Sequence, residues 1–389
     1  MDFELTPEQR EIQALARDFA RERIEPHAAE WDREHLFPRE LFGQLAELGL
    51  MGACVPEEYG GAGADFVSYI LVLEELSRAD AGVGVTVAVH TSATTLPILV
   101  FGTDEQKARF VPPLARGEVL GAFALTESEA GSDAGSLRTR AEPTEDGWTI
   151  TGAKQWITNG RYAGTFLLFA RTDEATDGAR GVSAFILDAD DVRVTRDEEK
   201  LGLNSSATND IVVEGAQVAR DRLLHEENKG FTVAMATLDG GRIGIAAQAL
   251  GIAQAAYDVA RSYAQQRHAF GQRIANFQAI QWKLADMSTE IDAARLLVYR
   301  AAWLKATGAP HTEEGAKAKL FASEMARRQT AEAIQILGGY GYTKEFPVER
   351  YYRDAKITEI YEGTSEIQRL VIARQILAQA EQAAAPASR

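Results

Sequence analysis

One acidic residue, Glu362, stands where a carboxylate could act on a bound ligand. It lies in EIYEGTSEIQRL (residues 359–370), directly before Gly363 and the start of an expected helix. Thr364 or Ser365 can cap that helix, and Ser365 fits a capping box with the glutamine three residues later. A helix start favours an ionised carboxylate or a bound anion because its first N–H groups are free. Glu362 is therefore either a solvated residue before a helix or a base directed at a ligand.

Two polar stretches could bind a cofactor. FALTESEAGSDAGS (residues 123–136) gathers hydroxyls, glycines and backbone donors, which suits phosphate or carbonyl oxygens but is equally typical of a tight turn. GAKQWITNG (residues 152–160) is patterned as a strand. Its Trp156, followed by Thr158, is either a core tryptophan, the usual fate of that residue in a strand, or a flat wall for a planar cofactor.

Arg267 is a further candidate, for binding a phosphate. It ends a long expected helix in RHAFGQRIANFQAIQ (residues 267–281), where a guanidinium either complements the helix dipole or forks a phosphate. The sequence has no GxGxxG after a strand, no GxxxxGK[ST] and no GxSxG. Nicotinamide-Rossmann, P-loop and α/β-hydrolase activities are therefore without support.

The composition predicts a soluble globular protein. Of its 389 residues, 46% are hydrophobic and 25% are charged, enough for two or three domains. The formal net charge of −16 argues against non-specific nucleic-acid binding, which requires a basic surface. We find no basic leader and no apolar run expected to span a bilayer, so a cytoplasmic location is expected.

No metal site is expected. Cys54 is the only cysteine, which excludes intrachain disulfides and cysteine-cluster metal sites. The six histidines are scattered without HExxH spacing.

The candidate residues must be positioned by three successive parts, which make the expected fold class α+β and multidomain. Residues 1–119 should form an N-terminal helical domain, in which a capping box at Thr6 starts the first helix. A last short helix within it, in DEQKARFVPPLARGE, should be broken by Pro112 and Pro113.

Residues 120–226 carry short β-branched and aromatic stretches between turns, which predict a middle domain, an antiparallel β-barrel or sandwich. Residues 227–389 are patterned as long helices, and the simplest arrangement is a C-terminal four-helix bundle whose fourth member follows Gly363.

Together and in this order, the stretches resemble the acyl-CoA dehydrogenase family over essentially the whole chain. The resemblance rests on ALTESEAGSD, GAKQWITNG, LDGGRIGIAAQALG, RHAFGQRIANFQ, QILGGYGYTKEFPVERYYRDAKI and EIYEGTSEIQR. In the central and C-terminal parts the chain is most similar to the short-chain, butyryl-CoA branch. The fold of that family agrees with the three parts described above.

The resemblance implies FAD as cofactor. The residues implied at the flavin and its phosphates are Phe123, Ala124, Leu125, Thr126, Gly131, Ser132, Trp156, Ile157 and Thr158, completed by Thr364, Ser365 and Glu366. The residues implied at the pyrophosphate and adenine of a neighbouring subunit's FAD are Arg267, Gln278, Gln335, Ile336, Leu337, Gly338 and Gly339. A homo-oligomer follows, usually a tetramer built as a dimer of dimers.

The resemblance also implies the reaction, the conversion of an acyl-CoA thioester to a trans-2-enoyl-CoA. Glu362 matches the base that removes the α-proton, flavin N5 accepts the β-hydride, and electrons pass to electron-transfer flavoprotein. The residues implied in substrate binding are Ser132, Asp239, Gly240, Gly241, Arg242 and Gly363. Some relatives place the base at the position of Gly241, where glycine cannot serve, so Glu362 is the only candidate base.

One departure from the family pattern is the pair Ser128-Glu129, where Pro-Gly is common. We expect the Glu129 side chain to point to solvent, because it would add negative charge near a phosphate site.

Two alternatives stay open: an acyl-CoA oxidase that uses oxygen, and a catalytically silent acyl-CoA-binding or scaffold protein of the same fold. Short to medium straight acyl chains are expected, although the residues do not determine acyl length or branching.

Overall fold

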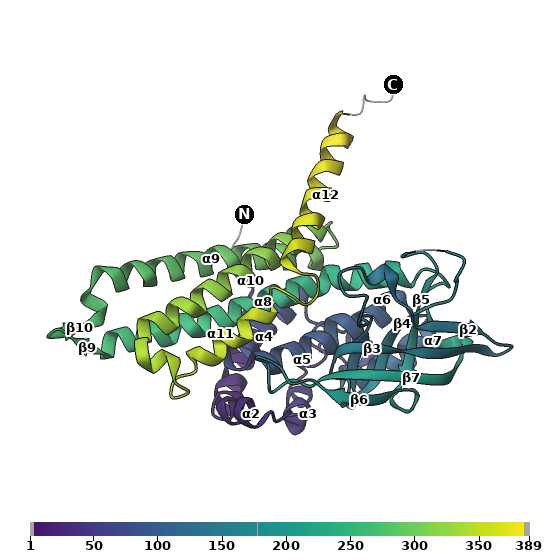
Figure 1. Cartoon of the computed structure of the whole chain (residues 1–389), viewed down its shortest axis with the longest axis horizontal. Coiled ribbons are helices and arrows are strands. Elements are labelled where there is room, and N and C mark those ends of the chain that lie inside the picture. Colours follow the sequence, from purple (N-terminus) through teal and green to yellow (C-terminus); the bar gives the residue numbers. More distant parts are fainter. Residues whose placement is uncertain (1–3, 177, 385–389) are drawn as a thin grey trace.

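The computed structural model describes residues 4–176 and 178–384, in which helices come first, a β-sheet follows and longer helices come last. The sheet lies at one end of an elongated molecule and the long helices extend away from it (Figure 1). The predicted α+β fold class is therefore confirmed, and the arrangement places the loops at the strand ends beside the helices.

The N-terminal part is helical, as predicted. Its helices are α1 (Pro7–Phe19), α2 (Ala28–Glu34), α3 (Arg39–Glu47), α4 (Phe66–Ala79), α5 (Ala81–Ala88), α6 (Leu96–Phe101) and α7 (Asp104–Ala115), with π-helical segments η1 (Ala20–Ile24) and η3 (Val89–Thr95). The capping box at Thr6 is present: its hydroxyl accepts the N–H of Gln9 at 3.1 Å, and the Gln9 side chain accepts the N–H of Thr6 at 3.0 Å.

The prediction that prolines break α7 is wrong. Pro112 and Pro113 lie inside the helix, in its last turn. Each proline removes one N–H donor and crowds the carbonyl group four residues earlier, yet the helix continues to Ala115. Its last turn is closed by the N–H of Arg116, which donates to Pro112 O at 3.0 Å.

One apolar stretch corrects the expectation that no run could span a bilayer. Ala81–Phe101 has the length and the mean hydropathy, 1.6, of a candidate span. It comprises α5, η3 and α6, and 83% of its most apolar window is buried inside the protein. A core segment of a globular protein passes the same test, and this stretch packs as one.

The middle part is one eight-stranded sheet in the order β6-β7-β3-β2-β4-β5-β8, with β1 paired to β4. The strands are β1 (Leu120–Ala124), β2 (Arg140–Pro143), β3 (Gly147–Thr158), β4 (Ala163–Arg171), β5 (Val182–Asp188), β6 (Arg193–Asp197), β7 (Thr208–Ala219) and β8 (Leu223–Leu224). Most pairs are antiparallel, as predicted, but β1 runs parallel to β4. Trp148, Phe166 and Phe185 pack in one shared cluster, as in the core of a barrel.

The C-terminal part contains α8 (Gly230–Gln266), α9 (Gln278–Ala306), α10 (Thr312–Leu337), α11 (Val348–Ile357) and α12 (Ser365–Ala384). A small hairpin, β9 (His268–Ala269) with β10 (Gln272–Arg273), joins α8 to α9. Figure 1 shows α8, α9, α10 and α11 alongside one another, whereas α12 projects from the body. The helix after Gly363, α12, is nevertheless attached to α10, where Arg369 donates to Glu324 at 2.7 Å.

The N-terminal and C-terminal helices share one core. Tyr69 and Leu73 of α4 are buried in the same cluster as Ile243 and Leu250 of α8 and Val298 of α9. The boundaries expected after residues 119 and 226 lie between α7 and β1 and between β8 and α8. The division into three domains stays a prediction, because the helical parts do not have separate cores.

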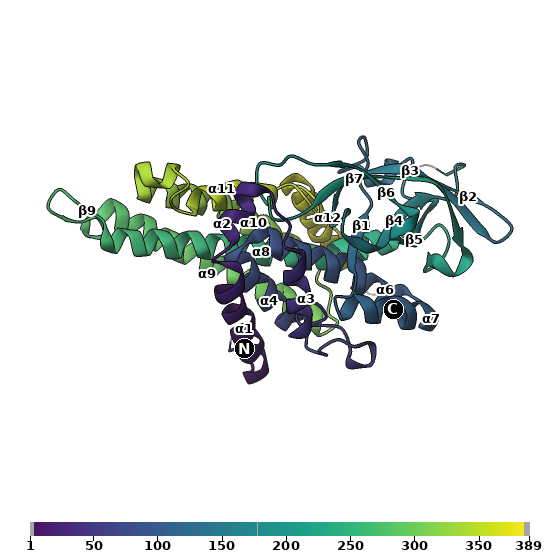
Figure 2. The same ribbon diagram turned by 90° about the horizontal axis from the view of Figure 1, so that it is seen from below.

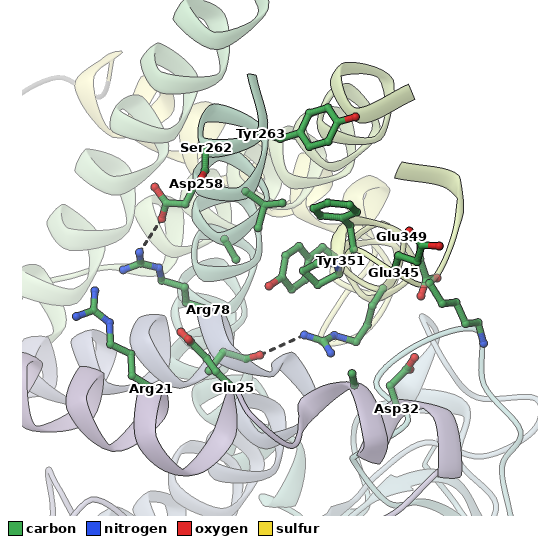
Figure 3. A pocket seen from close by; sticks show the side chains of 18 of the residues that line it. Arg21, Glu25, Asp32, Arg78, Asp258, Ser262, Tyr263, Glu345, Glu349 and Tyr351 are labelled. Carbon is green, nitrogen blue, oxygen red and sulfur yellow. Dashed lines mark hydrogen bonds and ion pairs between the residues drawn. The ribbon is translucent and has the colours of Figure 1, made fainter. Parts of the chain in front are cut away.

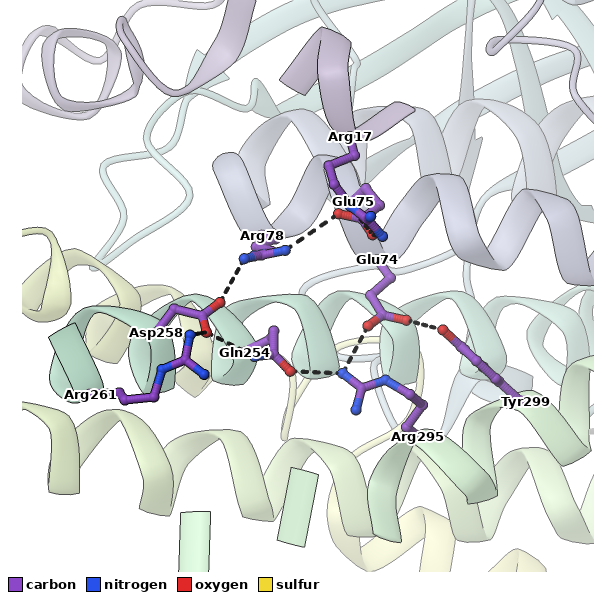
Figure 4. Close-up of polar contacts among 9 residues, drawn as sticks. All are labelled: Arg17, Glu74, Glu75, Arg78, Gln254, Asp258, Arg261, Arg295 and Tyr299. Carbon is purple, nitrogen blue, oxygen red and sulfur yellow. Dashed lines mark hydrogen bonds and ion pairs between the residues drawn. The ribbon is translucent and has the colours of Figure 1, made fainter. Parts of the chain in front are cut away.

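Buried charges also link α4 to other helices (Figure 4). Glu74 accepts hydrogen bonds from Tyr299 (2.7 Å) and Arg295 (3.2 Å) of α9, and Glu75 pairs with Arg17 of α1 (2.6 Å). Burial raises the pKa of Glu74, because it disfavours the charged form. The network aligns the helices that carry the site described below.

The close approach of α4 and α8 generates a stability prediction. A Cβ added at Gly251 would lie 2.4 Å from Glu74 O, whereas one added at Gly43, on the exposed side of α3, would meet nothing within 4 Å. We expect Gly251→Ala to lower the thermal midpoint, because overpacking costs about 1–3 kcal/mol. Gly43→Ala should raise it, since alanine is favoured over glycine in a helix by about 0.5–1 kcal/mol. Equal midpoints in thermal unfolding of the two variants would contradict the packing.

Candidate active site

Glu362 occupies a strained turn between α11 and α12. Its φ is +51° and that of Gly363 is +92°. A left-handed conformation is rare for a residue other than glycine, and it costs of order 1 kcal/mol or more. Such residues occur where the surrounding structure holds them in place, often at functional sites. The backbone therefore favours the interpretation of Glu362 as a functional residue.

The carboxylate of Glu362 fits a space that a glycine of α8 leaves open. A Cβ added at Gly241 would lie 1.9 Å from Glu362 Oε2. The Oε2 atom is buried, and among the described residues it has no hydrogen-bond partner. An unpartnered carboxylate oxygen is free to accept a proton. The glycine at position 241 is therefore required by the position of the acid.

Burial is the dominant influence on the charge of Glu362. It raises the pKa of the carboxyl group to about 7, while the nearby cations Lys319 and Arg242 oppose the rise. The expected effect of the helix start, which favours the ionised form, is outweighed. Near neutral pH the group is therefore poised between its acid and base forms, as a general base requires.

The helix start differs in detail from the prediction. Thr364 caps α12, because its hydroxyl accepts the N–H of Ile367 at 3.3 Å. The alternative capping box at Ser365 is wrong: its Oγ is buried without a partner, and the side chain of Gln368 instead donates to Gly363 O at 2.8 Å. Among the described residues the N–H of Glu362 forms no hydrogen bond, so it is available to a ligand oxygen.

The polar loop after β1 is held by a buried ion pair that we did not predict. Lys154 of β3 donates to Glu127 Oε1 at 2.8 Å, and both side chains are nearly inaccessible. Glu127 also accepts the N–H groups of Arg138 (2.6 Å) and Thr139 (2.9 Å). The sequence signal for this ion pair is a charged residue in each stretch, Glu127 in ALTESEAGSD and Lys154 in GAKQWITNG.

The remainder of the loop is open to solvent. Gly131 and Ser132 are exposed, and a Cβ at Gly131 would meet nothing within 4 Å. Glu129 is exposed as expected, and it pairs with Arg138 at 2.8 Å. The loop therefore has a rigid base at Glu127 and an open outer rim.

Trp156 is an exposed aromatic surface and not a core residue. It lies at a bulge between β3 and β7 with φ +59°, and 56% of it is exposed. Asn159, two residues after the buried Ile157, donates to Thr86 O (3.1 Å) and Gly121 O (3.0 Å). These bonds fix the end of β3 against α5 and β1, so the indole face has a defined position.

The residues predicted to contact substrate on α8 lie beside a small cavity. Asp239 and Gly240 line a cavity of about 180 Å³ together with Lys305 and His311. Arg242 pairs with Asp239, which also accepts a hydrogen bond from Thr312 at 2.7 Å. Gly241 and Arg242 do not line this cavity, and Gly241 lies against the Glu362 carboxylate. The substrate contacts of these residues stay a prediction.

A second set of predicted residues lies at the opposite end of the molecule. Ile336, Leu337, Gly338 and Gly339 line a cavity of about 550 Å³ with Arg267, whose guanidinium stands 5.7 Å from the ring centre of Tyr340. Gln278 and Gln335 are exposed nearby, on α9 and α10. Figure 2 shows the hairpin of this end far from the sheet. One chain therefore does not bring these residues to Trp156.

A cavity of about 870 Å³ lies away from Glu362, which does not line it. It lies among η1, α2, α4, α8 and α11, and charged side chains such as Arg21, Glu25, Asp32 and Glu349 line it (Figure 3). It adjoins the smaller cavity at Arg267, because both include Tyr263. We assign the candidate active site by chemistry, since the buried, unpartnered carboxylate lies elsewhere.

Comparison with known proteins gives matches along the chain. Three sequence profiles match: "Acyl-CoA dehydrogenase, N-terminal domain" at residues 6–118, the "middle domain" at 122–216 and the "C-terminal domain" at 228–377. The short-chain specific acyl-CoA dehydrogenase of Clostridium acetobutylicum is 48% identical, over 97% of this chain and 100% of the relative.

Two solved structures are similar throughout. Butyryl-CoA dehydrogenase from Megasphaera elsdenii superimposes with a TM-score of 0.95 at 47% identity, over 97% of this chain and 100% of that one. A chain in a structure described as an electron transferring flavoprotein of Acidaminococcus fermentans superimposes with a TM-score of 0.96 at 47% identity and the same coverage.

The buried pair beneath the loop generates a second stability prediction. Glu127→Ala should lower the free energy of unfolding by about 3–5 kcal/mol, because it leaves the Lys154 ammonium buried without a counter-charge. The double variant Glu127→Leu/Lys154→Met should recover much of the loss. The matched control Glu129→Ala removes an exposed pair from the same loop and should cost under about 1 kcal/mol. Urea denaturation tests this; equal losses for Glu127→Ala and Glu129→Ala would contradict it.

Proposed function

We propose a reaction for this chain, which belongs to the acyl-CoA dehydrogenase family. In that reaction, Glu362 is the base that removes the α-proton of a short- to medium-chain, straight acyl-CoA thioester. The observation that carries the proposal is the Glu362 carboxylate itself, buried over Gly241 with Oε2 unpartnered. The family is one of flavin-dependent oxidoreductases, and the high identity to short-chain relatives supports the same class of substrate.

The proposed reaction breaks two C–H bonds of the substrate. The α-proton passes to Glu362 Oε2, and the electron pair of that bond forms the new α,β double bond as hydride leaves the β-carbon. When bound, FAD supplies the acceptor for that hydride. The thioester carbonyl oxygen gains negative charge in the transition state, and the free N–H of Glu362 is placed to donate to it. The product is a trans-2-enoyl-CoA.

The described residues fit FAD in two places. The exposed indole of Trp156 offers a flat wall for a ring system, with Ile157 and Thr158 next to it in β3. In the loop from Phe123 to Ser132, the exposed Gly131 and Ser132 are open to a phosphate. At the far end, Arg267 and Gly338-Gly339 form an open cradle, because Cβ atoms at the two glycines would meet nothing within 4 Å. We propose that Thr364, Ser365 and Glu366 complete the flavin site at the start of α12.

The separation of these two places supports an oligomer. We propose that Arg267, Gln278 and residues 335–339 bind the FAD of a second copy, since they lie at the opposite end from the wall at Trp156. Exposed apolar side chains on α9, at Trp282, Leu296 and Trp303, follow a spacing that places them on one face of the helix. They are a surface on which copies could pack, in agreement with a tetramer built as a dimer of dimers.

We propose electron-transfer flavoprotein as the partner that takes the electrons, supported by the similar structure described as an electron transferring flavoprotein of Acidaminococcus fermentans. The cytoplasmic location stays a prediction.

The two alternatives are separated by simple observations: an oxidase forms peroxide with butyryl-CoA in air without another acceptor, and a silent scaffold cannot be reconstituted with FAD. The presence of Glu362, Arg267 and the Trp156 wall favours an enzyme over the silent scaffold, and peroxide formation separates the oxidase from the dehydrogenase.

The first test is anaerobic bleaching of the flavin by acyl-CoAs of different length. We expect butyryl-CoA and medium straight-chain thioesters to reduce the wild-type holoenzyme. Glu362→Gln should keep FAD and bind the thioester but lose turnover by at least about 10²-fold, as expected for loss of a general base. Bleaching only by long or branched thioesters would refute the substrate class, and an active Gln variant would refute the base.

The second test is the pH dependence of the bleaching rate. Glu362 must be ionised to accept the proton, and burial raises its pKa to about 7. The rate should therefore be full well above pH 7 and fall as the pH drops through that value, by about tenfold per unit. A rate that stays level from pH 8 to pH 5.5 in stopped-flow measurements would show that another group, or none, limits the step.

A further inference from the structure

A lysine of α10 lies buried next to the strained turn. Lys319 is 0% exposed, and its ammonium donates to Gly363 O at 2.7 Å. Among the described residues no carboxylate forms an ion pair with it. Burying a lysine without such a pair is costly. A plain packing role would be filled better by leucine or methionine, so the charge or the hydrogen bond requires an explanation.

The hydrogen bond of Lys319 acts on the turn that positions Glu362. Gly363 O accepts from both Lys319 Nζ and Gln368 Nε2, and the same Gln368 atom lies 3.2 Å from Glu362 O. Both residues of the turn have positive φ. Without donors that hold the two carbonyl groups, the turn could relax to a less strained conformation. Relaxation would move the Glu362 carboxylate and its N–H together.

Two cations favour the ionised form of Glu362, and the influence of Lys319 is larger than that of Arg242. Arg242 of α8 is already paired with Asp239. Two acids lie nearby. Glu359, before the turn, is paired with Arg327, and Glu366 of α12 is exposed.

Two phenols also lie close to the carboxylate. Burial raises the pKa of both Tyr69 of α4 and Tyr361, so they stay neutral. Burial lowers the pKa of Lys319 to about 8, and Glu362 opposes that fall, so the ammonium is mostly charged at neutral pH. Lys319 is therefore the cation available to counter the charge of Glu362.

We propose that Lys319 is a positioning residue for the proton transfer: its ammonium holds the Gly363 carbonyl, which fixes the Glu362 turn, and its positive charge favours the carboxylate form of Glu362. The inference rests on the proposed function, because it assigns a role to Lys319 in the same reaction. It differs from a purely structural role in one respect. A structural lysine would affect stability and flavin content, whereas a positioning lysine also shifts the pH at which the base becomes active.

The test uses the FAD-loaded enzyme and three substitutions. Lys319→Met removes the charge and the donor, Lys319→Gln removes the charge but keeps a donor, and Lys319→Arg keeps both. The matched control is Lys317→Met, which removes the same charge from α10 two residues away, where Lys317 pairs with Glu313. The rate of anaerobic bleaching by butyryl-CoA is measured from pH 5.5 to pH 10.

We expect Lys319→Met and Lys319→Gln to move the acid limb of the profile upward by about one to three pH units, the usual effect of losing an opposite charge at this range. At pH 7, where about half of the wild-type base is ionised, this is a fall in rate of about 5- to 500-fold that higher pH recovers. The Met variant should also have a lower maximum than the Gln variant, because it lacks the donor to Gly363 O. Lys319→Arg should keep the wild-type limb, and Lys317→Met should leave limb and maximum unchanged.

An acid limb in both Lys319→Met and Lys319→Gln that coincides with wild type would overturn the proposal, and so would an equal shift in Lys317→Met. If the Met variant fails to fold, the Gln variant decides the question alone. An infrared titration of the carboxyl band that Glu362→Gln removes measures the same shift without turnover. The proposed function fails if no acyl-CoA bleaches the wild type, and the infrared shift still decides the role of the Lys319 charge.

Discussion

The structure depends on placing one carboxylate in a dry space with no hydrogen-bond partner. The position of Glu362 is possible only because Gly241 has no side chain, since any Cβ there would overlap the acid. It also needs a backbone conformation that a glutamate rarely adopts. Both conditions are unfavourable for stability. The surrounding helices offset them, because Lys319 and Gln368 donate hydrogen bonds to Gly363 O in the turn and α8 provides Gly241. The turn is thus held by elements that are distant in sequence.

The same problem of buried charge is solved differently elsewhere in the molecule. Lys154 and Glu127 neutralise each other beneath the polar loop, and Glu74 takes hydrogen bonds from Tyr299 and Arg295. Those groups have partners and can act only as supports. Glu362 Oε2 has none. Glu198 Oε1 is also buried without a partner, but its other oxygen pairs with Arg196 at 3.2 Å. A paired charge stabilises a fold, whereas an unpaired one can exchange a proton, so we expect chemistry at Glu362.

Much of this was accessible from the sequence, where the signal is local. The cap at Thr6, the single long helix α8 and the strand with GAKQWITNG follow from short-range pattern. Features decided by tertiary contacts were missed or wrong. Pro112 and Pro113 do not end α7, whose last turn is closed by the N–H of Arg116. Gln368 donates to the turn and not to the start of its own helix, because Gly363 O lies within reach. No periodicity could show that Lys319 faces a carbonyl 44 positions away. The order of the motifs predicts the site residues as a set, and only the fold shows which of them lie together in one chain.

The distance between the wall at Trp156 and the cradle at Arg267 has a genetic consequence under the proposed arrangement. Each bound flavin would rest on two polypeptides, so a defect at Arg267 would harm the neighbour's centre and leave the chain's own base intact. Two differently defective alleles could then restore one complete centre between them in a mixed assembly, whereas either allele alone would have none. Inheritance of such defects would depend on which face of the molecule is altered.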